Sequence, residues 1–86
     1  MIVTIKNRTP FVIDICKAST ICTPIPPETT FSPPLTCRGW VHGHSQEGSF
    51  VIQKDYNDIT FKVWGDFTVS MQQSKEVATV TIMMKK

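Results

Sequence analysis

The chain has 86 residues, of which 41% are hydrophobic and 19% charged, and its formal net charge is +2. This length predicts one domain, residues 1–86, and the hydrophobic fraction excludes an intrinsically disordered chain. The small net charge does not indicate a nucleic-acid-binding protein, so we predict no nucleic-acid partner. Met1 is followed by an alternating pattern instead of a basic and then an apolar segment. We therefore expect a soluble domain, synthesised in the cytoplasm without a signal peptide.

Alternation of apolar and polar residues, typical of a β-strand with one buried face, begins at residues 1–6 and resumes at residues 11–17. The Asn and Pro of the intervening turn, residues 7–10, predict that these two strands form a hairpin. Further strands are expected at residues 35–41, 49–53, 59–64, 67–71 and 77–84, with a turn-rich connection from Gly43 to Gly48. Residues 77–84 have the strongest β propensity and predict a central or well-paired strand. Since no window shows a helical period, the predicted fold is all-β, a single compact antiparallel β-sandwich.

Residues 18–34 contain five of the six prolines, a density that excludes a helix or a central strand. We expect a loop here, with residues 28–31 as a short extended piece and Phe31 as its anchor to the core. A PxxP pattern from Pro24 to Pro27 leaves open an SH3-like partner, although no basic residue lies beside it. Asn7 and Thr9 also match the N-glycosylation acceptor pattern, which the expected absence of a signal peptide disfavours.

The chain has three cysteines, Cys16, Cys22 and Cys37. An odd number in a cytoplasmic protein predicts three reduced, mostly buried thiols and no bridge that is essential to the fold. One bridge plus a free thiol is the alternative. A Cys16–Cys22 bridge would close a short loop, and a Cys22–Cys37 bridge would pin the proline-rich segment. The sequence does not decide whether any two of them are joined.

Residues 36–50 concentrate the side chains with chemical potential, among them Cys37, His42 and His44. These three are weak metal candidates, because thiolate and imidazole suit zinc but the paired ligand spacing of structural zinc sites is missing. We predict no metal and no cofactor. A cysteine nucleophile with a histidine base can be drawn from the same residues, but no catalytic signature surrounds them. We therefore predict that the protein is not an enzyme.

The aromatic residues are more informative, because several fall near the expected strand ends or turns. A tryptophan there can lie at the lipid headgroup interface, with an apolar ring and one N–H donor. Trp64 shares a strand face with Thr60 and Lys62, opposite the apolar residues at 59, 61 and 63. The candidates for binding a lipid or a partner are Arg38, Trp40, Glu47, Tyr56 and Trp64. The alternative is that each aromatic ring closes one end of a small core and that the polar groups form a solvated rim.

The order of these features resembles that of the aegerolysins, small β-sandwich proteins that recognise membrane lipids. Residues 3–9, VTIKNRT, resemble the first strand and Asn-rich turn of that family. Residues 36–39, TCRG, resemble its cysteine-glycine-arginine stretch with arginine and glycine exchanged, and residues 45–50, SQEGSF, resemble its Gly-Thr-Glu-Gly-like turn and aromatic strand. This chain is shorter, has an unusually proline-rich loop and has fewer tryptophans around Trp64. The resemblance implies lipid recognition by Glu47 and Trp64 and a larger pore-forming protein as partner.

We therefore expect a non-enzymatic β-sandwich module that binds membrane lipid head groups, associates peripherally with membranes and belongs to a cytolytic pair. The alternative is a small structural or protein-interaction subunit, viral or accessory, that presents strand edges and the proline-rich loop to a protein partner.

Overall fold

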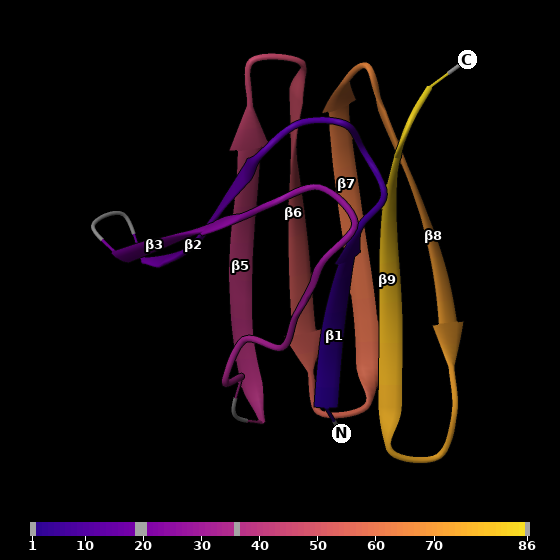
Figure 1. Ribbon diagram of the computed structural model, residues 1–86. Helices are drawn as coiled ribbons and strands as arrows, with labels where there is room; N and C mark the ends of the chain where they lie inside the picture. The colour runs from indigo at the N-terminus through magenta and orange to yellow at the C-terminus, as the bar shows by residue number, and fades with distance from the viewer. Residues whose placement is uncertain (1, 19–20, 36, 86) are drawn as a thin grey trace.

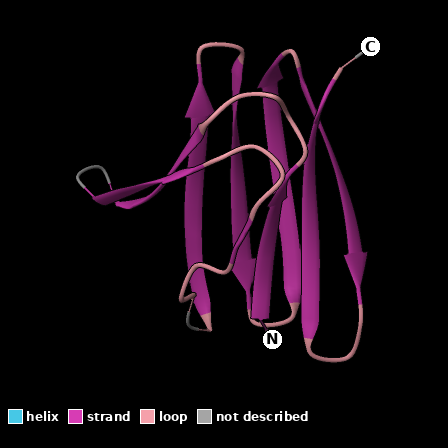
Figure 2. Ribbon diagram, viewed as in Figure 1, coloured by secondary structure: helices cyan, strands magenta, loops and turns pink. Residues whose placement is uncertain are grey.

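The computed structural model describes residues 2–18, 21–35 and 37–85, and their regular structure consists of β-strands (Figure 1, Figure 2). These strands are β1 (Ile2–Asn7), β2 (Ile13–Ala18), β3 (Ile21–Ile25), β4 (Thr30–Phe31), β5 (Arg38–Ser45), β6 (Gly48–Asp55), β7 (Asp58–Gly65), β8 (Phe67–Gln73) and β9 (Val77–Met84). The predicted all-β class is confirmed. The radius of gyration of 11.7 Å is that of a compact chain, for which about 12 Å is expected at this length. Within the described residues, no helix has the length and apolar character needed to cross a bilayer.

The strands form two sheets, with the orders β4-β1-β9-β8 and β3-β2-β5-β6-β7. Among the described ladders, β1 and β9 pair in parallel, from Ile2↔Val77 to Asn7↔Ile82, and the others are antiparallel. The prediction of a purely antiparallel arrangement is therefore wrong at this pair. Alternation along a strand identifies its buried face, but it carries no information on the direction of a partner at the other end of the chain. As predicted, β9 is well paired, because it lies between β1 and β8.

The first two strands do not form the predicted hairpin, because β1 and β2 belong to different sheets. The connection leaves β1 alongside β9, where the backbone N–H of Arg8 donates to the carbonyl of Ile82 at 2.9 Å. It then crosses to the second sheet near the top of the view in Figure 1. The strand ends near the predicted turn, although Asn7 still belongs to β1, and the connection joins two sheets instead of two neighbouring strands.

Asn7 organises this crossing from inside the protein, with a side chain that is 1% exposed. Its Nδ2 donates to the carbonyl oxygens of Phe11 at 2.8 Å and Ile25 at 3.0 Å. Its Oδ1 accepts from the backbone N–H of Thr9 at 3.0 Å and from the Thr9 hydroxyl at 2.7 Å. The amide thus supplies hydrogen-bond partners for backbone and hydroxyl groups around the crossing. This burial contradicts the glycosylation hypothesis, because an acceptor asparagine must be accessible.

The proline-rich segment is more regular than predicted. Ile21–Ile25 forms β3 at the edge of the five-stranded sheet, and Pro24 pairs there with Asp14 of β2. An edge strand tolerates proline, because the missing N–H can face away from the neighbouring strand. Since Ile25 is 4% exposed, the PxxP segment is not the free polyproline ligand considered above. The expected short extended piece is confirmed at Thr30–Phe31, which pairs with β1.

Strand β5 continues to Ser45, although a turn was expected to begin at Gly43. Gly43 is a strand residue opposite Phe50 of β6, and the Phe50 ring occupies the space above it. The glycine was therefore misread as a turn signal when it serves as a site of close packing.

Replacing Gly43 by alanine is expected to destabilise the fold by about 1–3 kcal/mol, because overpacked cores must distort. The added Cβ would lie 2.1 Å from Cζ of Phe50, a ring that is 0% exposed. The corresponding fall in melting temperature is roughly 5–20 °C for a domain of this size. Gly39→Ala is the matched control on the same strand, since its Cβ would meet a half-buried leucine side chain at 3.0 Å. Equal melting temperatures for the two variants would contradict this packing.

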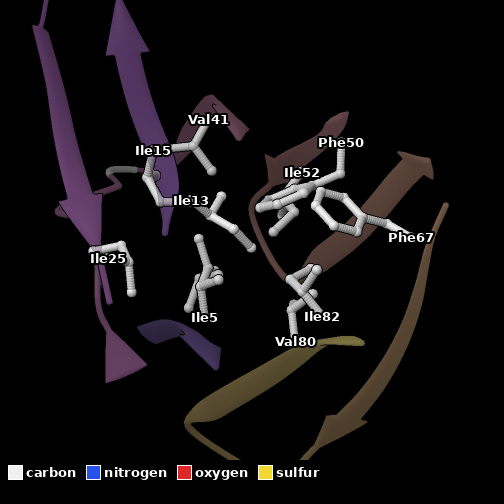
Figure 3. Packing of buried hydrophobic residues seen from close by; sticks show 11 residues of the cluster. Ile5, Ile13, Ile15, Ile25, Val41, Phe50, Ile52, Phe67, Val80 and Ile82 are labelled. Atoms are coloured by element: carbon white, nitrogen blue, oxygen red, sulfur yellow. The ribbon is translucent and has the colours of Figure 1, made fainter. Parts of the chain in front are cut away.

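One hydrophobic cluster joins the two sheets (Figure 3). Its buried members are Val3, Ile5, Ile13, Ile15, Ile25, Val41, Phe50, Ile52, Phe67, Val80 and Ile82. The rings of Phe50 and Phe67, one from each sheet, have centroids 6.4 Å apart and are inclined by 59°, a favourable tilted arrangement. The alternation at residues 1–6 and 11–17 thus identified strand faces that meet in the core, through Val3 and Ile5 and through Ile13 and Ile15.

A disulfide joins Cys16 of β2 to Cys22 of β3, whereas Cys37 is a free, exposed thiol. The prediction of three reduced, mostly buried thiols is therefore wrong in this structure. Cys16 and Cys22 face each other directly in the β2–β3 ladder, so the structure has the alternative arrangement, a Cys16–Cys22 bridge plus a free thiol.

Reduction of the bridge is expected to lower the melting temperature by about 10 °C. The bridge closes a loop across a sequence separation of 6, for which loop-closure entropy gives about 2 kcal/mol. The measurement is thermal unfolding with and without a phosphine reductant, with Cys22→Ser as the genetic equivalent. An unchanged melting temperature would show that the bridge adds no stability, as the sequence alone suggested.

Candidate functional site

The surface of the five-stranded sheet that faces away from the core carries most of the candidate residues. On β5, Val41 and Gly43 are buried, so the alternating residues Trp40, His42 and His44 project from the opposite side. We call this surface the outer face; on strands β5, β6 and β7 it consists of Trp40, His42, His44, Ser49, Val51, Gln53, Thr60, Lys62 and Trp64. Each of these residues is at least partly exposed.

The strand register arranges the outer face in rows. One row runs from Trp40 through Gln53 to Thr60, and another runs from His44 through Ser49 to Trp64. The two tryptophans therefore occupy diagonally opposite corners, two strand spacings and four residues apart, which corresponds to roughly 17 Å. Trp40 is 47% exposed and Trp64 is 50% exposed, so each presents about half of its side chain to solvent.

Two shallow hollows lie along this diagonal. The first has a volume of about 280 Å³ and is lined by Val51, Gln53, Thr60, Phe61, Lys62 and Trp64. The second has a volume of about 360 Å³ and is lined by Arg38, Gly39, Trp40, Gln53, Lys54 and Asp55. Gln53 belongs to both, so the hollows adjoin each other and each contains one of the tryptophans. The face therefore offers two apolar rings with amide, hydroxyl and charged groups between them.

Three of the predicted binding residues, Arg38, Trp40 and Tyr56, lie toward one end of the sheet. The Nε of Arg38 forms an ion pair with Oδ1 of Asp55 at 3.1 Å across the β5–β6 ladder. Both side chains are more than half exposed, so the ion pair contributes little to the stability of the fold. Its main effect is to fix where the two charges lie on the surface. Tyr56 is 62% exposed in the β6–β7 turn, and its backbone N–H donates to the carbonyl of Cys37. This bond ties the turn to the start of β5.

The other two, Glu47 and Trp64, lie together at the opposite end. Glu47 belongs to the β5–β6 turn, and its carbonyl accepts a hydrogen bond from the N–H of Asp66 at 2.9 Å. The adjoining residues Gly48 and Gly65 are paired, and Gly65 has a φ of 79°, a backbone conformation that favours glycine. This contact fixes the end of β7 against the turn. The structure thus splits the five predicted residues into two groups at opposite ends of one face.

The weak metal candidates are not brought together as a set. His42 and His44 share the outer face, with ring centroids 5.4 Å apart, but Cys37 lies before the start of β5, about 16 Å from His42 along an extended chain. Cys37 therefore lies too far from either imidazole to share a metal ion with it or to act as a nucleophile with a histidine as its base.

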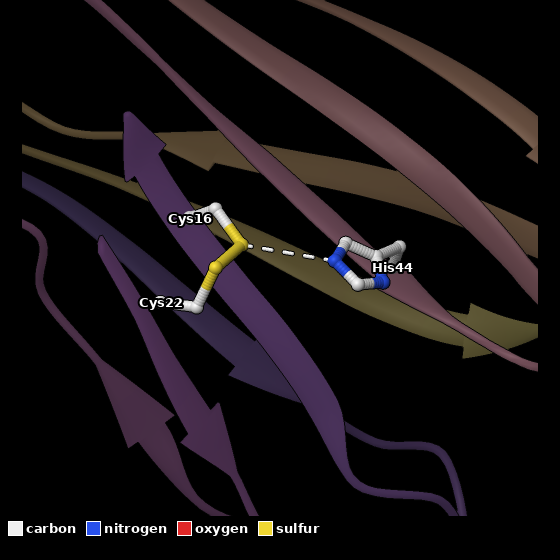
Figure 4. The surroundings of a disulfide bond; sticks show 3 residues. All are labelled: Cys16, Cys22 and His44. Carbon is white, nitrogen blue, oxygen red and sulfur yellow. Dashed lines mark hydrogen bonds between the residues drawn. A yellow bond between two sulfur atoms is a disulfide. The ribbon is translucent and has the colours of Figure 1, made fainter. Parts of the chain in front are cut away.

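The cysteines that do lie near a histidine are the bridged ones. Sγ of Cys16 is 3.7 Å from Nε2 of His44, as the dashed line in Figure 4 marks. The ligand atoms of Cys16, Cys22 and His44 all lie within 4.8 Å of one another. The segment between Cys16 and Cys22 was interpreted only as a short loop. The signal that was missed is that these two cysteines lie opposite each other on the neighbouring strands β2 and β3.

Comparison with protein-family models, with curated proteins and with solved structures found no significant match.

Proposed function

We propose that this protein is a non-enzymatic module that binds membrane lipid through the outer face. The observation that carries the proposal is the pair of half-exposed tryptophans at opposite corners of one sheet face. Indole combines an apolar ring with an N–H donor, which suits the boundary between head groups and acyl chains. Because both rings stand on the same side of a sheet, both can enter that boundary at once without a change in the fold.

The charges on and around the outer face favour a zwitterionic head group. Lys62 and the Arg38–Asp55 pair place cations and anions on the same surface, and Glu47 adds a carboxylate in the turn at the Trp64 end of the sheet. A head group that carries both a phosphate and an ammonium group can meet a partner of opposite sign for each. A surface of mixed sign gives little long-range attraction to an anionic membrane, so the tryptophans supply most of the affinity.

The finer fold assignment belongs to the same proposal: the two sheets pack face to face as a β-sandwich. The cluster that draws side chains from both sheets and the ring contact between Phe50 and Phe67 support this assignment. The resemblance to the aegerolysins extends the proposal to a larger pore-forming protein as a second partner.

Sedimentation with vesicles tests the proposal. We expect the protein to pellet with phosphatidylcholine or sphingomyelin vesicles, and we expect binding to change less than about threefold between low and high salt. Binding confined to anionic phosphatidylserine vesicles and abolished by salt would replace the proposed contacts with simple charge attraction. A protein that stays in the supernatant with every vesicle type would contradict the proposal.

A subunit that binds a protein partner is the second candidate function, and the free edge of β7 favours it. Among the described residues, β7 forms a ladder with β6 along one edge and has no ladder partner along the other. Such an edge offers backbone groups for strand addition, although Lys62 at mid-strand is a residue that discourages it. Size-exclusion chromatography with light scattering discriminates: we expect a monomer in the absence of vesicles, and a stable higher assembly would favour the second candidate.

A further inference from the structure

We propose that Cys16, Cys22 and His44 form a redox-gated zinc site, closed by the disulfide in the oxidised protein and opened by reduction. The three residues come from the neighbouring strands β2, β3 and β5 of one sheet. This site goes beyond the proposed lipid binding: His44 belongs to the outer face, but neither tryptophan takes part in the site.

The spacing of the three side chains suits a tetrahedral ion. Zinc lies about 2.3 Å from a thiolate sulfur and about 2.0 Å from an imidazole nitrogen, which sets sulfur and nitrogen roughly 3.6 Å apart around a tetrahedral centre. The observed distance from Sγ of Cys16 to Nε2 of His44 is 3.7 Å. All three candidate ligand atoms lie within 4.8 Å of one another. Reduction then needs to move the two sulfurs apart by side-chain rotation, while the backbone of the sheet stays in place.

The backbone around the site is held by two ladders. Cys16 pairs with Cys22 on one side and with His42 on the other, so β2 is fixed between β3 and β5. His44 projects from the same face of β5 as His42, two residues further along. Loss of the disulfide therefore removes a covalent link but leaves hydrogen-bonded strands that keep the three side chains close.

Access to the site is one-sided. Cys16 is 6% exposed, whereas Cys22 and His44 are exposed. Cys22 is an exposed residue on an edge strand, so it is the half of the bridge that a small thiol reductant can approach. In the metal-bound state the exposed side leaves a fourth position for water, as in zinc sites with three protein ligands.

The chemistry balances with a dithiol as reductant. Two electrons and two protons pass from the dithiol to the bridge, the Cys16–Cys22 bond breaks, and the dithiol closes into its own disulfide. Zinc then displaces the two thiol protons, which go to solvent. With the bridge intact, Sγ of Cys16 has no proton, so Nε2 of His44 is the donor in their contact. In the zinc site, His44 carries its proton on Nδ1, and the Nε2 lone pair binds the ion.

Cobalt(II) titration of the full chain, reduced with a phosphine, tests the proposal. We expect one equivalent to give the intense visible bands of a tetrahedral thiolate site, with none in the oxidised protein. Zinc should then displace the cobalt and raise the melting temperature of the reduced protein by mass action. Absence of the bands from the reduced protein would overturn the proposal.

Three variants assign the ligands. Cys22→Ser is expected to abolish the thiolate bands, and His44→Ala to weaken zinc binding by at least about tenfold. Cys37→Ser is the matched control, because Cys37 is a free thiol outside the cluster, and it should bind cobalt as the parent does. Bands that survive in Cys22→Ser, or that disappear in Cys37→Ser, would overturn the assignment. Circular dichroism of each variant confirms that the sheets remain folded.

Discussion

Replacing both Trp40 and Trp64 by alanine is expected to remove detectable vesicle binding. Loss of a single interfacial tryptophan typically costs about 2 kcal/mol, which corresponds to roughly 30-fold in affinity. The two residues lie far enough apart for their effects to add, so the double variant should lose roughly 1,000-fold. Since both side chains are about half exposed on the outer face, the melting temperature should change little. Vesicle sedimentation and thermal unfolding measure the two effects separately.

Ile2→Ala is the matched control for this loss. Ile2 is 56% exposed, as apolar as the deleted rings and located on the other sheet, next to Val77. It should leave vesicle binding unchanged if the outer face is the binding surface. If Trp64→Ala unfolds the protein, Trp64 is a core residue, and if both single variants bind normally, the rings are bystanders. Either result would contradict the proposed role.

Replacing the buried Asn7 by alanine is expected to lower the free energy of unfolding by about 3 kcal/mol or more. This is a larger loss than we expect for any other substitution of a polar residue in this chain. The substitution removes the donor to the carbonyls of Phe11 and Ile25 and the acceptor for the Thr9 hydroxyl. Because the Asn7 side chain is only 1% exposed, water does not readily replace these partners. A buried group left without its partner costs roughly 1–3 kcal/mol, and several are orphaned at once. The melting temperature should fall by at least about 12 °C.

The neighbouring Arg8→Ala serves as control for the crossing between the sheets. Arg8 makes an exposed ion pair with Glu28 at 3.8 Å, and such pairs contribute less than about 1 kcal/mol. A thermal unfolding scan should therefore separate two substitutions that are adjacent in sequence. Comparable losses for Asn7→Ala and Arg8→Ala would show that the turn, not the amide network, stabilises the crossing.

Local patterns predicted the strands and their faces well. The run of β-branched residues at 77–84 became β9, and the alternation at 59–64 placed Trp64 on the exposed side of β7. Alternation with a period of two is a property of a single strand, so it can be recognised without knowing which strands lie beside it. The expected turns also contained Glu47 and Tyr56, as the structure has them, whereas Arg38 was expected inside a strand at residues 35–41 and instead begins β5.

Long-range relations were not predictable in this way. The parallel pairing of β1 with β9 and the separation of β1 from β2 depend on which sheet each strand joins, a choice made by the whole core. Pro24 and Gly43 were misread because each has two uses, as a breaker and as a residue for an edge or a close approach. The Cys16–Cys22–His44 cluster was missed because of those errors, since its residues come together only if β3 is a strand and β5 extends to Ser45.

Quenching of tryptophan fluorescence by brominated lipids tests the central claim most directly. The chain has two tryptophans, so Trp40→Phe and Trp64→Phe each leave one probe at a known corner of the outer face. Each variant is mixed with phosphatidylcholine vesicles that carry bromine near the top of the acyl chains. The lipid-binding proposal predicts strong quenching of both remaining tryptophans, because both rings enter the interface together. Emission from Trp40 and Trp64 that is the same with brominated and ordinary vesicles would contradict it.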